Sequence, residues 1–471
     1  MTAFKSLTAL AVSALLAGCT TVNLDQTIEH TQAQTNALTG TQLKLLRTAE
    51  DKAARDTLVS TLLAAPLGQT SAIQIAVLNS PALQSLLAER WADLSQAVQS
   101  GRLPNPILRL ERVRLLDETE LGRVLAFGLL DLLTLPQRNQ MANARKAQAQ
   151  LQMTSDVTGL VTQVRMAWIH AIAAQETAIY ATQVYESAQA SAELAKRMQR
   201  VGNFTRLQRA RQQAFYADAA AQLLSSQQSA TASREALVRV LGLDDTQASA
   251  LKLPQRLPDI PKTFITPQEL NQKLATQRLD VRMAQAQLAT ASRAQGLTVL
   301  SSLTDAELGL VRNTARDTHE GTSTTSRGFE LDIRLPLFDW GDAQRANMNA
   351  TTLAASNRLE AVLRAASSEL RENYTAYRTA YDLSRHYRDE VVQLRKIISE
   401  ENVLLYNGMF IGVFELLADQ RDQVKSVMAA IAAQQQFWLA DAALQSTVLG
   451  KPMSAPAIST PSTASSEVAA H

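Results

Sequence analysis

The chain has 471 residues, of which 46% are hydrophobic, and its 46 basic and 44 acidic residues give a net charge of +2. That is enough apolar material to bury a core in two or three domains. The balanced charge excludes the electrostatic footprint of a nucleic-acid-binding protein. Only 5% of the residues are aromatic, whereas alanine and glutamine are abundant. This composition favours helices that pack closely through small side chains.

The N-terminus has the pattern of an exported lipoprotein. Lys5 is followed by an apolar run over residues 7–16 and then by small residues that end in Cys19, the only cysteine. This is the arrangement of a bacterial secretory signal. Residues 16–19 resemble a lipobox, so we expect residues 1–18 to be removed and Cys19 to carry the N-terminal lipid. An ordinary signal with a chance cysteine is the alternative. Thr20 follows where an Asp would retain such a lipoprotein at the inner membrane, which favours the outer membrane.

Residues 19–69 are polar with little periodicity, and we expect a partly extended leader. Helical spacing of apolar residues begins near Ser71. It stops at residues 101–106, because the two prolines there cannot be accommodated in a helix interior. The corresponding helix of the second half is expected at about 267–295, after a proline-rich linker at 251–266.

The sequence repeats itself at a spacing of about 206 residues. Gly202 interrupts one long Ala- and Gln-rich stretch, and Gly408 interrupts a second. Two further pairs mark the copies: Asn143-Ala144 with Asn349-Ala350, and Leu241-Gly242 with Leu449-Gly450. The last pair is 208 residues apart, so the second copy is expected to carry two extra residues after its glycine. A period this long indicates two whole structural units, at 70–250 and 267–450, and not a solenoid.

Each half also contains a segment with the period of a β-strand. Apolar residues alternate with polar ones from Phe329 to Leu337, so that one face would meet lipid and the other water. We expect a partner strand at about 297–312, a loop at 313–327, and strands at 107–115 and 123–133 in the first half. The predicted β-hairpins therefore span 107–133 and 297–337. A buried soluble hairpin in each half is the alternative.

Long helices follow the strands. Residues 137–201 contain no proline and one glycine, and residues 342–405 contain neither. Each stretch permits a helix of about 65 residues. Returning helices at 205–241 and 414–449 would complete antiparallel hairpins at 137–241 and 342–449. We expect Gly202 and Gly408 to permit the turns at the two tips.

Four strands cannot close a membrane barrel, because the smallest such barrels need about eight strands and lipid does not tolerate an open edge. We therefore expect the chain to oligomerise. Three copies, a homotrimer, would supply 12 strands and a matching ring of helices.

Several short motifs follow one another along the chain from about residue 70 to 450. They are Ala76 with Asn79-Ser80-Pro81, Gly101-Arg102-Leu103-Pro104-Asn105-Pro106, Arg278-Leu279-Asp280-Val281, the segment 335–341, and Tyr406-Asn407-Gly408 with Glu415-Leu416-Leu417. Together they resemble the TolC family of outer-membrane efflux lipoproteins. The resemblance implies a mainly α fold with a membrane β-barrel portion: a trimeric 12-stranded barrel on an α-helical periplasmic tunnel. It also implies docking on a periplasmic adaptor and an inner-membrane pump.

The resemblance further implies a gate at the helical tips. Glu415 and Asp419 would form an acidic ring in the trimer, and Tyr406 is a candidate latch to a neighbouring hairpin. The alternatives are solvated surface charges and a packed aromatic. Gln208 stands where family members often have Asp, so the ring would be less acidic than usual.

The favoured function is an outer-membrane exit duct of a tripartite efflux pump. The tip at residues 406–409 resembles those of members that serve resistance-nodulation-division pumps, which favours small toxic solutes as substrates. A non-conducting periplasmic coiled-coil lipoprotein and a type I protein-secretion duct are the alternatives. The five histidines are scattered, and neither a phosphate-binding loop nor a nucleophile elbow occurs. We therefore expect no enzymatic activity, no metal and no cofactor beyond the lipid on Cys19. The tail, 451–471, is expected to be disordered.

Overall fold

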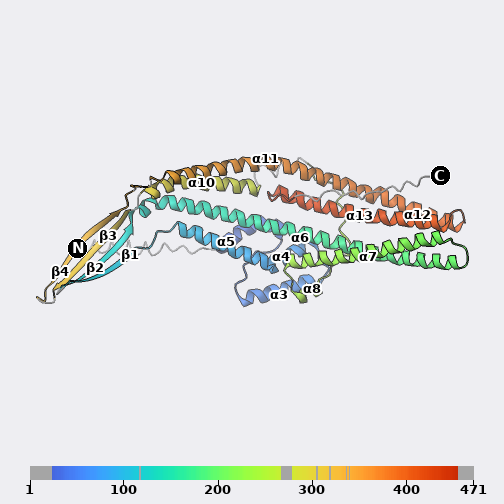
Figure 1. Cartoon of the computed structure of the whole chain (residues 1–471), viewed down its shortest axis with the longest axis horizontal. Helices are drawn as coiled ribbons and strands as arrows, with labels where there is room; N and C mark the ends of the chain where they lie inside the picture. The colour runs from blue at the N-terminus through green and yellow to red at the C-terminus, as the bar shows by residue number, and fades with distance from the viewer. Residues whose placement is uncertain are drawn as a thin grey trace. The chain divides into compact units, whose positions relative to one another are not determined.

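The structure is a computed structural model that describes residues 24–115, 118–266, 278–303, 306–317, 320–335, 337–338 and 340–453 (Figure 1). The expected signal peptide and Cys19 lie outside these residues, as does most of the expected tail. The chain divides into two compact units. One contains 88–153 and 282–361 with the start of the chain, and the other contains 32–87, 154–281 and 362–471. Each half of the repeated sequence therefore contributes to both units.

The first unit holds a four-stranded antiparallel sheet in the order β1-β2-β3-β4 (Figure 1). Its strands are β1 (Ile107–Leu115), β2 (Glu118–Gly128), β3 (Ala306–Asp317) and β4 (Ser323–Ile333). Each half of the sequence supplies one hairpin, and the two hairpins join through β2 and β3. Within the described residues, β1 and β4 are therefore edge strands that each pair on one side only.

The strand boundaries differ from the expected ones in both halves. Residues 129–133 begin a helix, because a continuous apolar run has no period that separates strand from helix. Residues 297–303 also belong to a helix. Conversely, 313–317 and 323–327 are strand and not loop, since Thr and Ser fit a pleated surface and Thr314 pairs with Thr325.

Two helices occupy the segment expected as a partly extended leader. They are α2 (Leu24–Thr39) and α3 (Ala49–Leu63). The stripe that α2 buries is largely polar, with Thr27, Thr31 and Thr35 each at most 1% exposed. Hydropathy therefore could not reveal it, although the spacing of four residues is helical. A capping box begins α3, in which Thr48 and Asp51 satisfy each other's backbone N–H groups.

In the first half, the expected helix at 71–100 is two helices, α4 (Gln69–Asn79) and α5 (Pro81–Ser100). The break falls at Ser80, whose ψ of 115° is extended, because a residue before proline is disfavoured in the helical region. The remaining helices of this half are α6 (Leu129–Arg200), α7 (Arg206–Leu241) and α8 (Asp245–Ala250).

The second half contains α10 (Leu279–Leu303), α11 (Asp342–His386), α12 (Val392–Asn407) and α13 (Val413–Val448). The expected single helix at 342–405 is interrupted by a π-helical segment, η1 (Tyr387–Val391). A π-helical turn accommodates one inserted residue within an otherwise α-helical run. The expected start of the earlier helix, at residue 267, lies outside the described residues.

The proline-rich linker belongs to the second unit, where its backbone carbonyls accept hydrogen bonds from side chains of α11 and α13. Tyr381 donates its hydroxyl hydrogen bond to Lys262 O at 3.0 Å, and Trp438 Nε1 donates to Pro258 O at 2.9 Å. Tyr381 also belongs to a buried aromatic cluster with Tyr377 and Phe437, whose ring centroids are 5.6 Å apart. Several of the few aromatic residues thus pack together where the linker meets α11 and α13.

The bases of the two helical hairpins close in the same way. Gly242, with φ of 69°, lies so near the α4–α5 junction that a Cβ there would be 2.8 Å from Ser80 Cα. Gly450, with φ of 80°, lies equally close to the start of α10, where a Cβ would be 2.6 Å from Leu279 N. Only glycine combines positive φ with so close a backbone approach.

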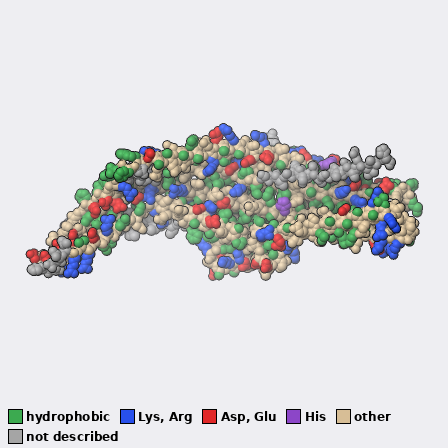
Figure 2. Space-filling model, viewed as in Figure 1, with side chains coloured by type: hydrophobic (Ala, Val, Ile, Leu, Met, Phe, Trp, Pro, Cys, Tyr) green, Lys and Arg blue, Asp and Glu red, His purple; other side chains and the backbone are tan. Residues whose placement is uncertain are grey.

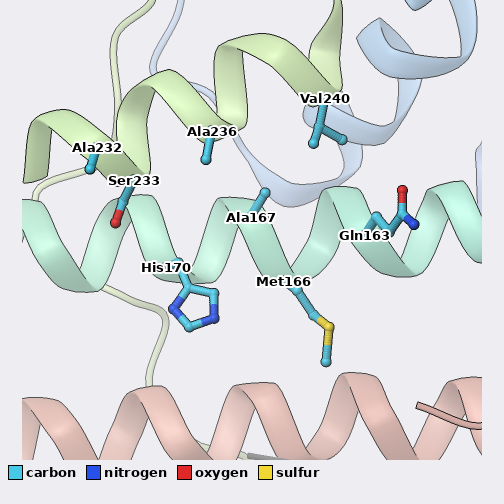
Figure 3. Close-up of a pocket in the computed structure, with 8 residues that line it drawn as sticks. All are labelled: Gln163, Met166, Ala167, His170, Ala232, Ser233, Ala236 and Val240. Carbon is cyan, nitrogen blue, oxygen red and sulfur yellow. The ribbon is translucent and has the colours of Figure 1, made fainter. Parts of the chain in front are cut away.

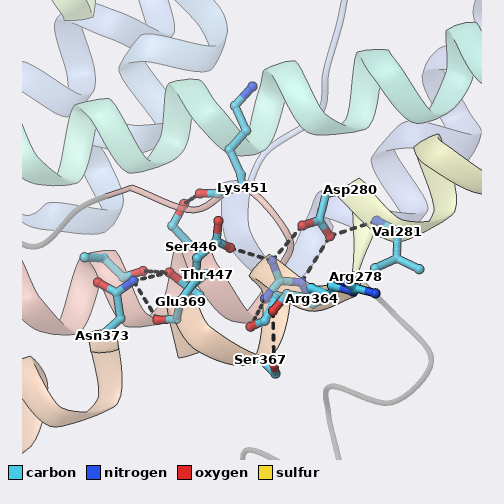
Figure 4. A network of polar contacts seen from close by, with 12 residues as sticks. Arg278, Asp280, Val281, Arg364, Ser367, Glu369, Asn373, Ser446, Thr447 and Lys451 are labelled. Atoms are coloured by element: carbon cyan, nitrogen blue, oxygen red, sulfur yellow. Dashed lines mark hydrogen bonds and ion pairs between the residues drawn. The ribbon is translucent and has the colours of Figure 1, made fainter. Parts of the chain in front are cut away.

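A buried ion-pair network fixes the base of the second hairpin (Figure 4). Arg278 Nη2 lies 2.6 Å from Asp280 Oδ2 and 3.1 Å from Glu369 Oε2, and its Nη1 donates to Ala366 O. Burial alone would lower the pKa of Arg278, but the two carboxylates raise it above its usual value. The guanidinium therefore stays charged and joins α10 to α11 at this point.

Candidate functional site: the two hairpin tips

The tip of the first hairpin is a five-residue turn between α6 and α7. Asn203 N–H donates to Met198 O at 2.9 Å, and Gly202 N–H donates to Gln199 O at 3.1 Å. This pair of bonds is a Schellman motif, which requires a left-handed residue just past the helix. Gly202, with φ of 83°, is that residue.

The second tip has the same bonds 207 residues later. Phe410 N–H donates to Leu405 O at 2.9 Å, and Met409 N–H donates to Tyr406 O at 3.0 Å. The left-handed residue here is Met409, with φ of 64°, and not Gly408, as was expected. Gly408 has φ of −76°, and its role is spatial, because a Cβ there would be 2.8 Å from the Phe410 ring.

The two extra residues of the second copy therefore do not follow Gly408. The helices α7 and α13 are each 36 residues long, and both turns have five residues. The spacing between copies rises from 206 at Asn143 to 207 at Gly202, and η1 lies between the corresponding residues of the second copy. The other extra residue is at the base, where Leu449 separates α13 from Gly450 while Gly242 follows α7 directly.

The returning helices begin differently at the two tips. Thr205 caps α7 by accepting from Gln208 N–H at 3.2 Å, and Gln208 Oε1 accepts from Thr205 N–H at 2.8 Å. At the second tip Gly412 stands at the N-cap and has no side chain to offer. Glu415 occupies the position of Gln208, with its exposed carboxylate near the positive end of the α13 dipole. The first tip is thus capped by two side chains, whereas the second relies on backbone and charge.

Asp419, one turn after Glu415, is in a different environment. It is only 8% exposed, and its Oδ2 is buried without a hydrogen-bond partner among the described residues. A buried carboxylate oxygen without a partner is costly, so this atom marks a place where a further hydrogen-bond donor would be stabilising. The expected pair of acidic residues therefore separates into an exposed carboxylate and a buried one.

Tyr406 lies in the last turn of α12 and is 38% exposed. Its hydroxyl donates to none of the described residues of the chain, so the proposed latch has no partner on its own hairpin. Apolar side chains around it are open to solvent, with Met409 93% and Phe410 82% exposed. Among the described residues, this second tip therefore presents an exposed apolar end.

The sequence did not reveal a link between the two returning helices. Arg421 on α13 donates through Nη2 to Gln212 Oε1 on α7 at 3.1 Å, and its guanidinium lies 4.2 Å from the centre of the Phe215 ring. Burial lowers the pKa of Arg421, and Asp218 opposes that shift. Gln212 is also buried and lies 207 residues before Asp419, so the two residues are at equivalent positions of the two returning helices. A spacing of 207 residues, in place of 206, is the sequence signal that could have matched them.

A hollow of about 490 Å³ between α6 and α7 carries no comparable chemistry (Figure 3). It is lined mainly by small and apolar side chains, and His170 points from α6 away from α7. His170 Nδ1 lies 2.9 Å from Gln435 Nε2, and burial lowers the pKa of this imidazole. Among the described residues, no group of three or more His, Cys, Asp or Glu could hold a metal ion. No described helix is long and apolar enough to cross a membrane.

Comparison with solved structures identifies the fold. A membrane protein from Pseudomonas aeruginosa matches with TM-score 0.66 and 19% identity, covering 83% of this chain and 94% of that one. The CmeC outer membrane channel of Campylobacter jejuni matches with TM-score 0.65 and 14% identity, covering 84% and 86%. The outer membrane protein VceC of Vibrio cholerae matches with TM-score 0.64 and 15% identity, covering 84% and 96%. The chain thus has the fold of outer-membrane channels.

The resemblance to the TolC family is confirmed at the level of the fold. The expected fold class, a mainly helical chain with a smaller β portion, is confirmed with it. No family model matches the sequence, and no curated protein matches it.

Proposed function

We propose that this chain is the outer-membrane exit duct of a tripartite efflux system. In this proposal it is a homotrimer whose sheets form a 12-stranded barrel and whose helices form a tunnel through the periplasm. The likeness in fold to solved outer-membrane channels supports the proposal. A periplasmic adaptor and an inner-membrane pump of the resistance-nodulation-division type would be the partners, and small toxic solutes the cargo.

The observation that carries the proposal is that, among the described residues, β1 and β4 each leave one edge of the sheet unpaired. Along β4, Phe329, Leu331 and Ile333 are 78%, 50% and 51% exposed and share one face. An apolar sheet face suits lipid, but every backbone group within lipid must be paired. Edge β1 of one copy must therefore join edge β4 of the next, and three copies close a ring of 12 strands. Such closure needs about eight strands or more. One copy, with four strands, is therefore too few, two copies would only reach this minimum, and three copies exceed it.

The N-terminal lipid on Cys19 remains part of the proposal and is tested separately. Metabolic labelling with a fatty-acid analogue should mark the wild-type chain and leave Cys19→Ser unlabelled. The barrel should still place the unlabelled variant in the outer membrane. Equal labelling of both proteins would contradict lipidation at Cys19.

We further propose that the second tip is the gate. Three copies of Glu415 would stand around the periplasmic end of the tunnel, and like-charge repulsion with partial desolvation would set the free energy of opening. The unsatisfied Asp419 Oδ2 and the exposed apolar end support a neighbouring chain or adaptor as its partner.

The test of the proposed function has two parts. After extraction from membranes, the full chain should run on a gel as a heat-resistant trimer, and in a planar bilayer it should give single-channel currents. A protein that salt washing releases as a monomer, or one that gives no currents, would contradict the proposal.

A further inference from the structure

The register of the sheet separates its charges by face. Residues that pair across antiparallel strands point to the same side, so the pairings assign every strand residue to one of two faces. One face, here named the arginine face, carries six arginines and no carboxylate. The six are Arg112, Arg114, Arg123, Arg312, Arg316 and Arg327. The strands' seven carboxylates, among them Glu111, Glu120 and Glu330, all lie on the opposite face, here named the acidic face, which has Arg109 as its only basic residue.

The arginine face is also the apolar face. Leu108, Leu125, Leu310 and Phe329 form one row across the four strands, and Leu108 is 62% exposed. This face would meet lipid in the proposed barrel, since strands of membrane barrels place apolar residues outward and polar residues inward. The inference below rests on that proposed function.

The arginines occupy one end of the face. The next row beyond the apolar one, about 7 Å along the strands, contains Arg123, Arg312 and Arg327. The other three, Arg112, Arg114 and Arg316, lie beyond this row, toward the turns of the two hairpins. All four connections to helices leave the sheet at its other end. In a duct whose helices lie in the periplasm, the arginines therefore reach the external leaflet.

This arrangement places like charges next to one another. Arg123 pairs with Arg312, which pairs with Arg327, so three like charges stand side by side on adjacent strands. Like charges directly opposite each other destabilise a sheet. All three side chains are exposed, and none forms an ion pair with a described residue. Figure 2 shows basic and acidic side chains over these strands, and the register shows that the carboxylates are on the other face.

We propose that the arginine face binds the phosphate groups of lipid headgroups in the external leaflet. Guanidinium groups bind phosphate with two parallel N–H···O bonds, and a row of three suits several phosphates at one depth. Each bound phosphate would lie on the external side of the apolar row, at the depth where acyl chains end and headgroups begin. The row thereby fixes the depth of the barrel as well as the lipid species around it.

The test uses the purified full-length protein in a zwitterionic detergent, titrated with phosphatidic acid, whose headgroup is a bare phosphomonoester. Native mass spectrometry gives the dissociation constant. The wild type should prefer phosphatidic acid to phosphatidylcholine, and the triple variant Arg123→Gln, Arg312→Gln, Arg327→Gln should bind it about a hundredfold more weakly. Replacing the same three residues by Lys should restore part of the affinity.

The matched control changes three residues of the acidic face, Glu111→Gln, Glu120→Gln and Glu330→Gln, and should leave the affinity for phosphatidic acid unchanged. If the triple Gln variant does not fold, Arg312→Gln alone, at the centre of the row, should still weaken binding about fivefold. Unchanged affinity in the arginine variants, or an equal loss in the acidic-face control, would overturn the proposal. So would full displacement of the lipid by inorganic phosphate at the same concentration, which would mark a simple anion site.

Conductance separates this inference from the proposed function. Every protein is first tested for single-channel currents in phosphatidylcholine alone. Currents without a preference for phosphatidic acid would refute lipid binding and leave the duct standing. An absence of currents in the wild type would refute the duct itself.

Discussion

The two helical hairpins of this chain are closed alike at their bases and differently at their tips. Gly242 and Gly450 each place a left-handed glycine against the start of another helix. At the tips, the first turn has a glycine at the left-handed position and a capping box, whereas the second has Met409 and an uncapped Gly412. The comparison shows that the two copies have the same geometry at the base and different geometry at the tip, which is where the proposed gate lies.

The largest expected effect tests the likeness of the bases. Gly242→Ala and Gly450→Ala should each lower the free energy of unfolding by about 2–4 kcal/mol, because an added Cβ is strained at positive φ and overlaps backbone atoms. Denaturant unfolding followed by circular dichroism measures this. Gly202→Ala is the control, since it shares the positive φ but faces open space, and it should cost only about 1–2 kcal/mol. Equal losses in all three variants would show that the close approach at the bases contributes nothing.

The second prediction concerns a difference between the bases. Asp441 on α13 stands where the first hairpin has Arg234, 207 residues earlier. Burial raises the pKa of Asp441 to about 6, although the charge of Arg165 and a hydrogen bond from Gln445 oppose the shift. The unfolded carboxyl ionises near pH 4. Between pH 4 and pH 6 the carboxyl is ionised in the unfolded chain but still protonated in the folded one, so the free energy of unfolding falls as pH rises. Above pH 6 both states are ionised, and the loss of stability stays constant.

The stability of the wild type relative to Asp441→Asn should accordingly fall by about 2–3 kcal/mol between pH 4 and pH 7. Unfolding midpoints at a series of pH values measure the difference. Arg234→Gln, the matched variant in the first hairpin, should show no such dependence on pH. A constant difference for Asp441→Asn would mean that this carboxyl is not perturbed.

The third prediction tests the cap at the first tip. Thr205→Ala should destabilise the start of α7 by about 1 kcal/mol, because it removes the acceptor for Gln208 N–H. Amide hydrogen exchange in the first turn of α7 should become about fivefold faster. Thr231→Ala, on an exposed face of the same helix, is the control and should leave that turn unchanged. If both variants exchange alike, the capping box does not stabilise this tip.

The smallest expected effect is at the second tip. Met409→Gly should stabilise the turn by about 0.5–1 kcal/mol, since glycine adopts positive φ without the strain of a side chain. Slower amide exchange at residues 409 and 410 would show it. The reverse change at the equivalent position, Gly202→Met, should speed exchange at the first tip. A faster second tip in Met409→Gly would contradict the assigned geometry.

Sequence periodicity was sufficient for the long helices and for the alternation in β4, because apolar spacing directly reflects which residues share one side of an element. It failed where the signal was polar. The buried stripe of α2 consists of threonines, and the extended ends of β3 and β4 carry Ser and Thr. Aligning identical letters also set Gly202 against Gly408, whereas the hydrogen bonds of the turns set it against Met409.

The candidate site was predictable only in part, because burial and contacts between distant helices do not follow from local sequence. Glu415 and Asp419 lie one turn apart in the sequence pattern, but burial, which distinguishes them, depends on neighbouring helices. Arg421 and Gln212 are joined across two helices that lie about 200 residues apart in the chain, and no local motif marks that bond.

The central claim is a duct gated at the second tip, and single-channel conductance of paired tip variants tests it most directly. Glu415→Ala should raise conductance at neutral pH above that of the wild type, because it removes both side-chain volume and charge from the proposed constriction. Gln208→Ala, at the equivalent position of the first tip, should change conductance much less. Equal effects of the two variants, or no effect of Glu415→Ala, would contradict a gate at the second tip, and an absence of currents in the wild type would contradict the duct.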